Sequence, residues 1–163
     1  MSISQRMNKK VLSSTQAATL CQTLRRSGKK IVFTNGCFDV LHLGHVRYLA
    51  QARKLGDVLV VGLNSDASIR RLKGPERPIN RQSDRAEVLS ALEPVSFVCL
   101  FSQDTPLKLI QKVKPHVLVK GGDWKGKEVV GADWVSSYGG KLKLISFVKG
   151  RSSTAVLEKI KKL

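Results

Sequence analysis

The sequence predicts an α/β protein built on a single parallel sheet of five strands, with helices on both faces. Short continuous apolar segments alternate along the chain with segments of about ten residues that have helical periodicity. Continuous apolar strands are typical of parallel sheets, because both faces of such sheets are buried, and an intervening helix supplies each crossover. The chain has 163 residues, which is the size of one domain.

The predicted strands are short apolar segments at residues 31–34, 58–63, 95–101, 117–119 and 142–148. After the second of them the sequence becomes basic and contains the helix breakers Gly74, Pro75 and Pro78. These residues predict a loop between the second strand and the next helix.

The predicted helices, which have helical periodicity or recognisable start and stop residues, cover residues 13–26, 45–55, 83–92, 106–113, 127–137 and 152–162. Ser13 and Gln16 have the spacing of a capping box. Ser83 is a predicted N-cap, and Thr105 is a predicted N-cap followed by a proline at the first helical position. Glycines close three of these helices, namely Gly28, Gly56 and Gly139.

The chain is strongly basic, with 29 Lys and Arg residues against 12 Asp and Glu residues and a formal net charge of +17. The first acidic residue is Asp39. Such a surface attracts polyanions, which include nucleic acid, anionic lipid and phosphorylated small molecules. A solvated basic surface without a dedicated partner is the alternative. We expect a basic N-terminal tail and helix over residues 1–28 and the folded domain over residues 29–163.

Cysteine usage indicates a reducing compartment. The three cysteines, Cys21, Cys37 and Cys99, form no CxxC pair and are odd in number, which argues against a disulfide scaffold or a cysteine zinc site. No apolar stretch approaches the ~18 residues of a membrane span. Residues 1–10 lack the apolar core of a secretory signal. We therefore expect a cytoplasmic protein without a membrane span.

Polar, glycine-rich sequence follows the predicted strands at residues 35–39, 64–66, 120–124 and 149–154. In parallel α/β sheets, ligands bind beyond the carboxyl ends of the strands, where the strand order reverses. The sequence therefore predicts a binding site at this edge of the sheet.

Residues 34–45, Thr-Asn-Gly-Cys-Phe-Asp-Val-Leu-His-Leu-Gly-His, carry the most specific pattern. His42 and His45 flank Gly44 at the predicted start of a helix, where backbone N–H groups attract anions and a missing Cβ lets a ligand approach. Two imidazoles there can donate hydrogen bonds to the oxygens of a triphosphate under attack. The alternatives are a capping histidine beside a surface histidine, or a zinc site, for which no third ligand has suitable spacing. The third histidine, His116, is expected to be structural.

This segment resembles the nucleotide-binding motif of the cytidylyltransferase-like nucleotidyltransferases. The resemblance implies a Rossmann-like, doubly wound fold and an enzyme that joins a nucleoside triphosphate to a phosphorylated acceptor with release of pyrophosphate. Residues 120–124 are similar to the family segment that receives the base, and residues 150–154 are similar to its late Gly-x-Ser-Thr-Thr motif for the triphosphate. Residues 70–78, with Asp84 and Arg85, occupy the place of its basic loop and following helix.

Within the family, residues 64–68 and the segments RLKG, RP and LVKGGD most closely resemble the adenylyltransferase half of the bifunctional heptose kinase/adenylyltransferases. That resemblance implies synthesis of ADP-heptose from ATP and D-glycero-β-D-manno-heptose 1-phosphate, as part of lipopolysaccharide biosynthesis. The alternative is a glycerol-3-phosphate-type cytidylyltransferase, which shares the DWxGK element at residues 123–127. Lys120 and Phe147 depart from the cytidylyltransferase pattern and favour the heptose branch, whereas Arg151 and Ala155 depart from both.

The resemblance also implies residue roles. The catalytic residues are His42, His45 and Lys73. The nucleotide-binding residues are Cys37, Phe38, Gly44, Lys120, Gly121, Asp123, Ser152, Ser153 and Thr154. The acceptor-binding residues are Asn35, Asp39, Arg85 and Trp124. Two of these residues have an alternative role. Asp39 could instead orient the motif at residues 34–45, and Arg85 could instead form an ion pair with Glu87 or Asp84. No metal-binding residue is predicted, and Mg²⁺ is expected to arrive with the ATP triphosphate.

A function of a different class is a nucleic-acid-binding module that uses the basic tail and residues 70–85. Aromatic residues make up only 6% of the chain, so platforms for stacking bases are scarce, and no RNA-binding motif is present. We therefore expect small-molecule substrates rather than nucleic acid. The family resemblance further suggests a homodimer.

Overall fold

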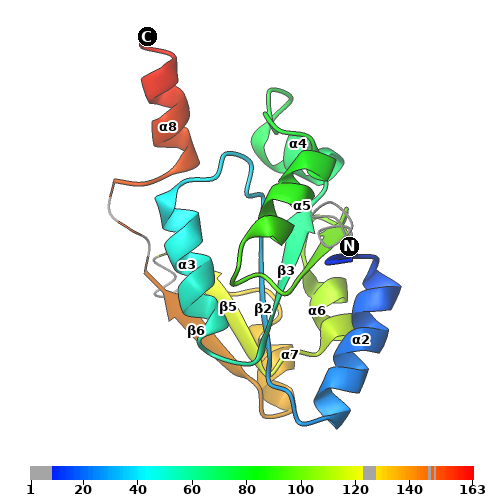
Figure 1. The fold of residues 1–163 in the computed structure, drawn as a ribbon. Helices are drawn as coiled ribbons and strands as arrows, with labels where there is room; N and C mark the ends of the chain where they lie inside the picture. Colours follow the sequence, from blue (N-terminus) through cyan, green and yellow to red (C-terminus); the bar gives the residue numbers. More distant parts are fainter. Residues whose placement is uncertain (1–8, 123–127, 147, 149) are drawn as a thin grey trace.

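The computed structural model contains one sheet of six parallel strands with helices against both faces (Figure 1). It describes residues 9–122, 128–146, 148 and 150–163. The predictions for the N-terminal tail up to residue 8 and for Asp123, Trp124, Gly126, Lys127 and Phe147 lie outside these residues. No helix in the described part of the chain is long and apolar enough to cross a membrane.

The strand order explains where a site can form. In chain order the strands are β1 (Val11–Leu12), β2 (Ile31–Gly36), β3 (Val58–Asn64), β4 (Phe97–Phe101), β5 (Val117–Gly121) and β6 (Lys141–Ile145). Across the sheet they run β1-β4-β3-β2-β5-β6. From β2 the chain moves outward through β3 to β4 and then returns to place β5 on the other side of β2. The order therefore reverses between β2 and β5, which is the place where ligands enter doubly wound sheets.

The predicted count of five strands is wrong by one. The additional strand, β1, consists of Val11 and Leu12 and pairs in parallel with Val98 and Cys99 of β4 at the edge of the sheet. A segment of two residues has no periodicity that can be read, so only the pairing across the folded chain defines it as a strand.

Seven helices lie within the described residues: α2 (Ser14–Arg26), α3 (Leu43–Arg53), α4 (Asp66–Lys73), α5 (Gln82–Ala91), α6 (Leu107–Val113), α7 (Ala132–Ser137) and α8 (Ser153–Ile160). The loop predicted after the second strand is wrong in part, because residues 66–73 form α4. The Ser65 hydroxyl caps α4 by accepting the Ser68 N–H at 3.2 Å, and basic residues in the last turn favour the negative end of the helix dipole.

Several predicted helix starts can be compared with the structure. The Ser13 and Gln16 capping box is confirmed, because each side chain accepts the backbone N–H of the other residue. Ser83 is not an N-cap, since α5 begins at Gln82 after Arg81. Thr105 is not an N-cap either, because Pro106 takes that position. The helix predicted over 127–137 begins only at Ala132, after Gly131 in the left-handed region (φ 86°).

Each face of the sheet carries its own core. The α3 and α5 helices cover one face, where β3 contributes Leu59, Val61 and Leu63. The α2, α6 and α7 helices cover the other face, where β3 contributes Val58 and Val60. This alternation on a continuously apolar strand explains why β3 is buried along its whole length.

The α3 helix places a polar side chain in the core. Val46 is 39% exposed, whereas Tyr48, Leu49 and Ala52 are buried. The Tyr48 hydroxyl is hydrogen-bonded to Thr34 Oγ1 at 2.6 Å and donates to the Val119 carbonyl at 3.3 Å. Hydrogen bonds to β2 and β5 therefore let a polar side chain occupy the core.

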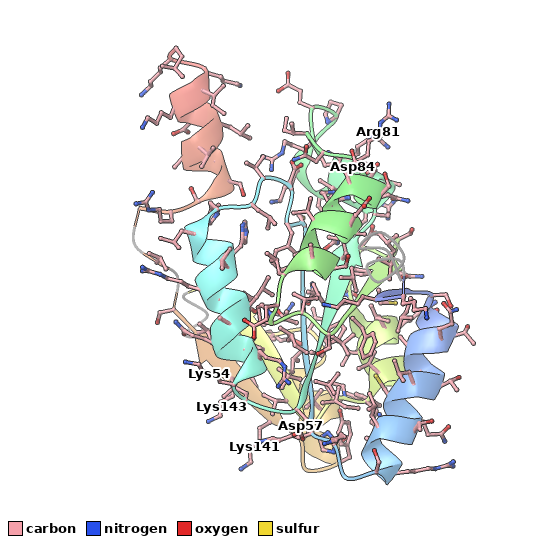
Figure 2. All side chains as sticks on the ribbon, viewed as in Figure 1. Lys54, Asp57, Arg81, Asp84, Lys141 and Lys143 are labelled. Atoms are coloured by element: carbon pink, nitrogen blue, oxygen red, sulfur yellow. The ribbon has the colours of Figure 1, made fainter. Side chains whose placement is uncertain are left out.

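Positive charge is spread over both ends of the sheet (Figure 2). Arg81 lies at the carboxyl end, whereas Lys54, Lys141 and Lys143 lie at the opposite end and are exposed. Lys141 and Lys143 belong to the edge strand β6, where charged side chains discourage pairing with another chain. Part of the net charge of +17 is therefore remote from the carboxyl end of the sheet.

Ser13→Ala removes the hydroxyl that caps α2, and we expect it to lower the free energy of unfolding by about 1 kcal/mol. The α2 helix buries Ala17 and Cys21 in the same core as β4 and α6, so the loss should affect the whole domain. Urea denaturation measures this change. Thr15→Ala, which removes an exposed hydroxyl outside the cap, should cause no loss. An unchanged midpoint for Ser13→Ala would mean that α2 unfolds independently of the sheet.

Candidate active site

Three adjoining cavities open at the carboxyl end of the sheet. The switch-point cavity, about 530 Å³, lies at the ends of β2 and β5. The histidine cavity, about 210 Å³, lies between the start of α3 and the start of α8. The α8 cavity, about 550 Å³, lies between α8 and the segment from Lys73 to Ile79. Lys73 lines all three cavities, so its side chain lies where they meet.

His42 forms the N-cap of α3. Its Nδ1 accepts the Gly44 N–H at 3.1 Å, so in the neutral ring the proton is on Nε2, which remains a donor. Burial, followed by the positive charge of Arg151, lowers the pKa of His42. His42 is therefore held as a neutral imidazole with one defined N–H.

The His45 ring stacks near His42, with ring centroids 4.0 Å apart and planes inclined by 31°. The Phe38 ring lies on it at 5.3 Å and 58°. Burial, followed by the charges of His42 and Lys73, lowers the pKa of His45 to about 4. The buried Nδ1 of His45 has no hydrogen-bond partner among the described residues. An unsatisfied polar atom of this kind marks a position where a ligand can complete the bonding.

The packing of the His42 ring requires a glycine at position 44. A Cβ at this position would lie 2.8 Å from His42 Cε1 and 2.9 Å from its Nδ1. The glycine therefore makes room for the capping imidazole. The close ligand approach that we predicted at Gly44 is a separate matter and stays a prediction.

The structure brings most of the predicted residues together. The histidine cavity is lined by the predicted residues His42, Gly44, His45, Lys73, Ser152, Ser153 and Thr154. The switch-point cavity is lined by the predicted residues Asn35, Cys37, Phe38, His45, Lys73, Lys120 and Gly121. Asp123 and Trp124 lie outside the described residues. The carboxyl edge of the sheet therefore gathers segments that are more than a hundred residues apart.

Lys120 and Asn35 bridge the switch point. Lys120 Nζ donates to Asn35 Oδ1, which joins the end of β5 to the end of β2. Burial lowers the pKa of Lys120 to about 8. A polar pair in the lining of the switch-point cavity therefore joins two parallel strands.

The start of α8 is attached to the histidine motif. Ser152 Oγ caps the helix by accepting the Ala155 N–H at 3.0 Å, and Ser153 Oγ donates to the Val40 carbonyl at 2.9 Å. Arg151 precedes them and lines the histidine cavity. The Ser152 and Ser153 hydroxyls thus already make bonds within the chain, and Thr154 lines both the histidine cavity and the α8 cavity.

Asp39 holds the segment that follows α4. It is 3% exposed, and its carboxylate accepts hydrogen bonds from Arg77 Nε at 2.7 Å and from the Ile79 and Asn80 N–H groups at 2.9 Å. Burial alone would raise its pKa, but the bonds from Asn80, Ile79 and Arg77 lower it below the ordinary value. These bonds hold the segment from Arg77 to Asn80, and both predicted roles of Asp39 stay predictions.

Arg85 joins three segments and is 2% exposed. Its guanidinium donates to the Asn80 carbonyl at 3.0 Å, the Cys37 carbonyl at 2.6 Å and Asp66 Oδ1 at 2.8 Å. The predicted pairing with Glu87 or Asp84 is wrong, because α5 turns this side chain inward to α4. Its predicted contact with the acceptor stays a prediction.

Several lining residues were missed in the sequence. Tyr48, Asn64, Leu72 and Pro106 line the switch-point cavity, and Arg77 lines the α8 cavity. Burial raises the pKa of Tyr48 to about 12, so its hydroxyl remains protonated. Asn64, Leu72 and Arg77 belong to segments that carry the family resemblance, but no role was predicted for them there. Tyr48 and Pro106 lie outside those segments.

His116 lies at the other end of the sheet. Its Nδ1 accepts the Ile31 N–H at 2.9 Å, which agrees with the structural role that we expected. Its imidazole therefore binds the start of β2 and lines none of the three cavities.

Comparisons with known proteins agree with this geometry. The model of the cytidylyltransferase-like family matches residues 33–149. The bifunctional protein HldE of Trichlorobacter lovleyi is 54% identical over 153 residues, which cover 94% of this chain and 30% of that protein. HldE of Campylobacter concisus is 62% identical over 137 residues, which cover 84% of this chain and 28% of that protein. The chain thus spans about 30% of the length of these relatives.

Two solved structures are also similar. The lipopolysaccharide core biosynthesis protein from Thermoplasma volcanium has a TM-score of 0.62 and 33% identity, covering 76% of this chain and all of that one. Pantoate-beta-alanine ligase from Francisella tularensis, complexed with beta-gamma ATP and beta-alanine, has a TM-score of 0.60 and 15% identity, covering 94% of this chain and 78% of that one. The second likeness bears on the fold alone.

We expect the free energy of unfolding to decrease as the pH falls from about 6.5 toward about 4. The folded-state pKa of His45 lies at about 4, below its ordinary value of 6.5, so in this range the unfolded chain binds a proton that the folded chain does not. Denaturation at several pH values measures the slope. His45→Gln should flatten it in part, because His42 and His116 also have lowered pKa values. An equal slope in wild type and variant would contradict the assignment.

Arg85→Met should lower the free energy of unfolding by about 3–5 kcal/mol, since it leaves the Asp66 carboxylate and two carbonyl groups without their partner. Thermal and urea unfolding measure the change. Arg81→Met, at an exposed N-cap that makes no side-chain capping bond, is the matched control and should change stability by less than about 0.5 kcal/mol. Similar stability of the two variants would show that Arg85 does not brace the loops.

Proposed function

The chain belongs to the cytidylyltransferase-like family, and on that premise we propose that it is an adenylyltransferase that joins ATP to a sugar 1-phosphate. The proposed acceptor is D-glycero-β-D-manno-heptose 1-phosphate, and the products are ADP-heptose and pyrophosphate. The observation that supports the proposal most strongly is the pair of adjacent imidazoles of His42 and His45, which line the histidine cavity together with Lys73.

The relatives support the choice of reaction. The HldE proteins are called bifunctional, and this chain matches 28–31% of their length, as expected for one of two activities. The similar Thermoplasma volcanium structure is that of a lipopolysaccharide core biosynthesis protein, which agrees with a sugar as acceptor.

In the proposed reaction an oxygen of the acceptor phosphate attacks the α-phosphorus of ATP in line. One P–O bond forms to this oxygen, and the bond from the α-phosphorus to the β-phosphate oxygen breaks, so that pyrophosphate leaves with the electron pair. Chemistry of this kind depends on positioning and on neutralising charge. No general base is needed, because the acceptor phosphate is already ionised near neutral pH.

The histidines and Lys73 supply the electrostatic part. His42 Nε2–H and the His45 ring are donors for the equatorial oxygens, on which negative charge grows. Lys73 adds a full positive charge where the nucleotide and the acceptor meet. The lowered pKa values of both histidines keep them neutral before binding, so Lys73 does not face two further cations.

The switch-point cavity suits the nucleoside in this proposal. Phe38, Leu72 and Pro106 offer apolar surface for a base, and Lys120 offers a polar group next to it. Asn35, for which we predicted a role in acceptor binding, is the hydrogen-bond partner of Lys120 in the same cavity. Binding sites for small ligands combine a mostly apolar wall with a few polar groups in this way. The triphosphate then extends into the histidine cavity toward the start of α8.

Magnesium enters the proposal as part of the nucleotide substrate. Among the described residues no three Asp, Glu, His or Cys side chains are grouped so that they could hold a metal ion. Hard cations such as Mg²⁺ often bind through substrate phosphates with few protein ligands. The phosphate oxygens are therefore the proposed ligands.

The test is pyrophosphate release from ATP, Mg²⁺ and heptose 1-phosphate. We expect His42→Asn and His45→Gln each to lower kcat by about 10²- to 10³-fold, because each removes a donor to the transition state. Asparagine at position 42 preserves a capping side chain for α3, so a loss of activity there reports the imidazole and not the helix start.

His116→Gln is the control, because His116 lies outside the three cavities and has no donor role in the proposed reaction. This variant should retain kcat within about twofold. CTP in place of ATP, and glycerol 3-phosphate in place of the sugar phosphate, test the cytidylyltransferase alternative in the same assay. Full activity of both His42→Asn and His45→Gln would refute the proposed mechanism.

A further inference from the structure

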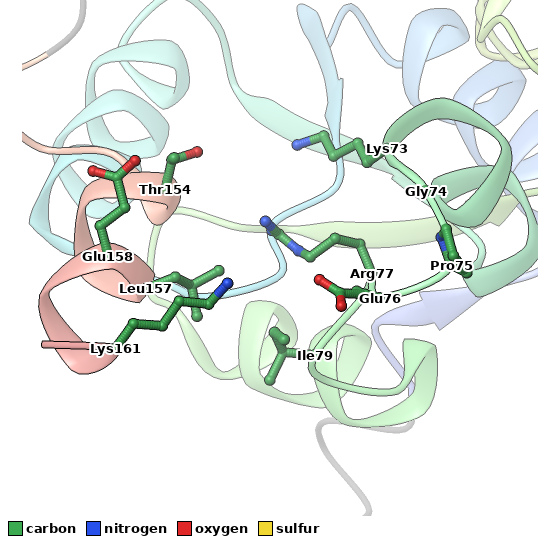
Figure 3. Close-up of a pocket in the computed structure, with 10 residues that line it drawn as sticks. All are labelled: Lys73, Gly74, Pro75, Glu76, Arg77, Ile79, Thr154, Leu157, Glu158 and Lys161. Atoms are coloured by element: carbon green, nitrogen blue, oxygen red, sulfur yellow. The ribbon is translucent and has the colours of Figure 1, made fainter. Parts of the chain in front are cut away.

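The α8 cavity has no assigned occupant in the proposed reaction, although it shares Lys73 and Thr154 with the histidine cavity. Its two banks come from distant parts of the chain. Residues 73–79 form one bank, and the other is formed by Thr154, Leu157, Glu158 and Lys161 of the C-terminal segment (Figure 3). The volume of about 550 Å³ is typical of a small-molecule site.

Both signs of charge line this cavity. Lys73, Arg77 and Lys161 are cationic, whereas Glu76 and Glu158 are anionic. A cavity for nucleic acid or for a polyphosphate alone would not gain from carboxylates, because these repel phosphate. Carboxylates are hydrogen-bond acceptors for hydroxyl groups. The lining therefore suits a ligand that has both a phosphate and several hydroxyl groups.

Arg77 is held in place for such a ligand. Its Nε donates to Asp39 Oδ2 at 2.7 Å, and Asp39 is itself held by the Ile79 and Asn80 N–H groups. Among the described residues no acceptor is bonded to the two terminal nitrogens of Arg77, and Figure 3 shows its guanidinium projecting toward the C-terminal bank. The ion pair thus orients a cation whose remaining donors face the cavity.

The C-terminal bank is formed by a helix that packs little against the rest of the protein. No residue of α8 is buried, and the bond from Ser153 to Val40 ties its first turn to the loop before α3. Leu157 and Ile79 give the cavity an apolar part, on opposite banks. Glu158 and Lys161 therefore line the α8 cavity without being buried in a core.

We propose that the α8 cavity binds the phosphorylated sugar acceptor, and that Glu158 and Lys161 determine its specificity. This inference rests on the proposed function. Lys73 and Arg77 face the phosphate of the acceptor next to the histidine cavity, and Glu158 and Lys161 bind sugar hydroxyls farther along. In-line attack then requires the acceptor oxygen to approach the α-phosphorus from the side opposite to the leaving pyrophosphate.

The experiment measures steady-state kinetics of the full chain with ATP and heptose 1-phosphate. Glu158→Gln and Lys161→Ala should each raise KM for the acceptor by roughly tenfold, which corresponds to one lost hydrogen bond to a charged group. The KM for ATP and kcat should stay within about twofold. Both residues are exposed, so the variants should fold like the wild type.

Matched controls separate specificity from general effects of charge. Lys159→Ala removes the same charge from α8 outside the cavity, and Glu87→Gln removes a carboxylate from the exposed face of α5; neither should change acceptor KM. With glycerol 3-phosphate, which has fewer hydroxyl groups, the effects of Glu158→Gln and Lys161→Ala should shrink, whereas a structural defect would affect both acceptors equally.

The outcomes distinguish the two proposals. If wild-type protein releases no pyrophosphate with any sugar phosphate, the proposed function itself fails. If the wild type is active and the acceptor KM is unchanged in both Glu158→Gln and Lys161→Ala, the α8 cavity is not the acceptor site. Calorimetric titration of heptose 1-phosphate into the same variants gives a second reading that does not depend on turnover.

Discussion

Two buried charged groups, Asp39 and Arg85, hold the loop on which the site depends. This loop, between β2 and α3, has no regular structure of its own, and Phe38 within it has a left-handed backbone (φ 45°) that costs a non-glycine residue free energy. Arg85 binds the Cys37 carbonyl on one side of Phe38, and Asp39 binds the segment from Arg77 to Asn80 on the other. The strained residue is thereby kept where its ring packs on His45.

The electrostatics of the site follow from fixed cations around neutral histidines. Lys73 and Arg151 lower the pKa values of His45 and His42 in addition to burial, so the cavity is positive without charged imidazoles. A triphosphate would reverse this effect, because its negative charge favours the protonated ring. The strong positive charge of the chain would help to attract the two anionic substrates of the proposed reaction, although the exposed lysines of β6 lie at the other end of the sheet.

The proposed roles of the three cavities agree with how firmly the elements that line them are packed. The histidine and switch-point cavities are formed mainly by elements packed on the sheet, whose positions are set by the two cores. The α8 cavity has one wall from a helix without a buried residue. In the proposed reaction, the chemistry that needs accurate positioning would therefore lie mainly on rigid elements, and recognition of the acceptor on a segment whose side chains can change without disturbing a core.

Local pattern in the sequence was enough for the strand–helix alternation, the capping box of α2 and the place of His42 and His45 at a helix start. Each of these is encoded within a few neighbouring residues, by periodicity or by capping chemistry. The strand β1, the partners of Arg85, the Asp39 brace and the α8 cavity emerged only from the tertiary structure. These features depend on contacts between distant residues, such as Ser153 and Val40, which are 113 positions apart. The strand order brings such residues together, and neither local segment encodes that order.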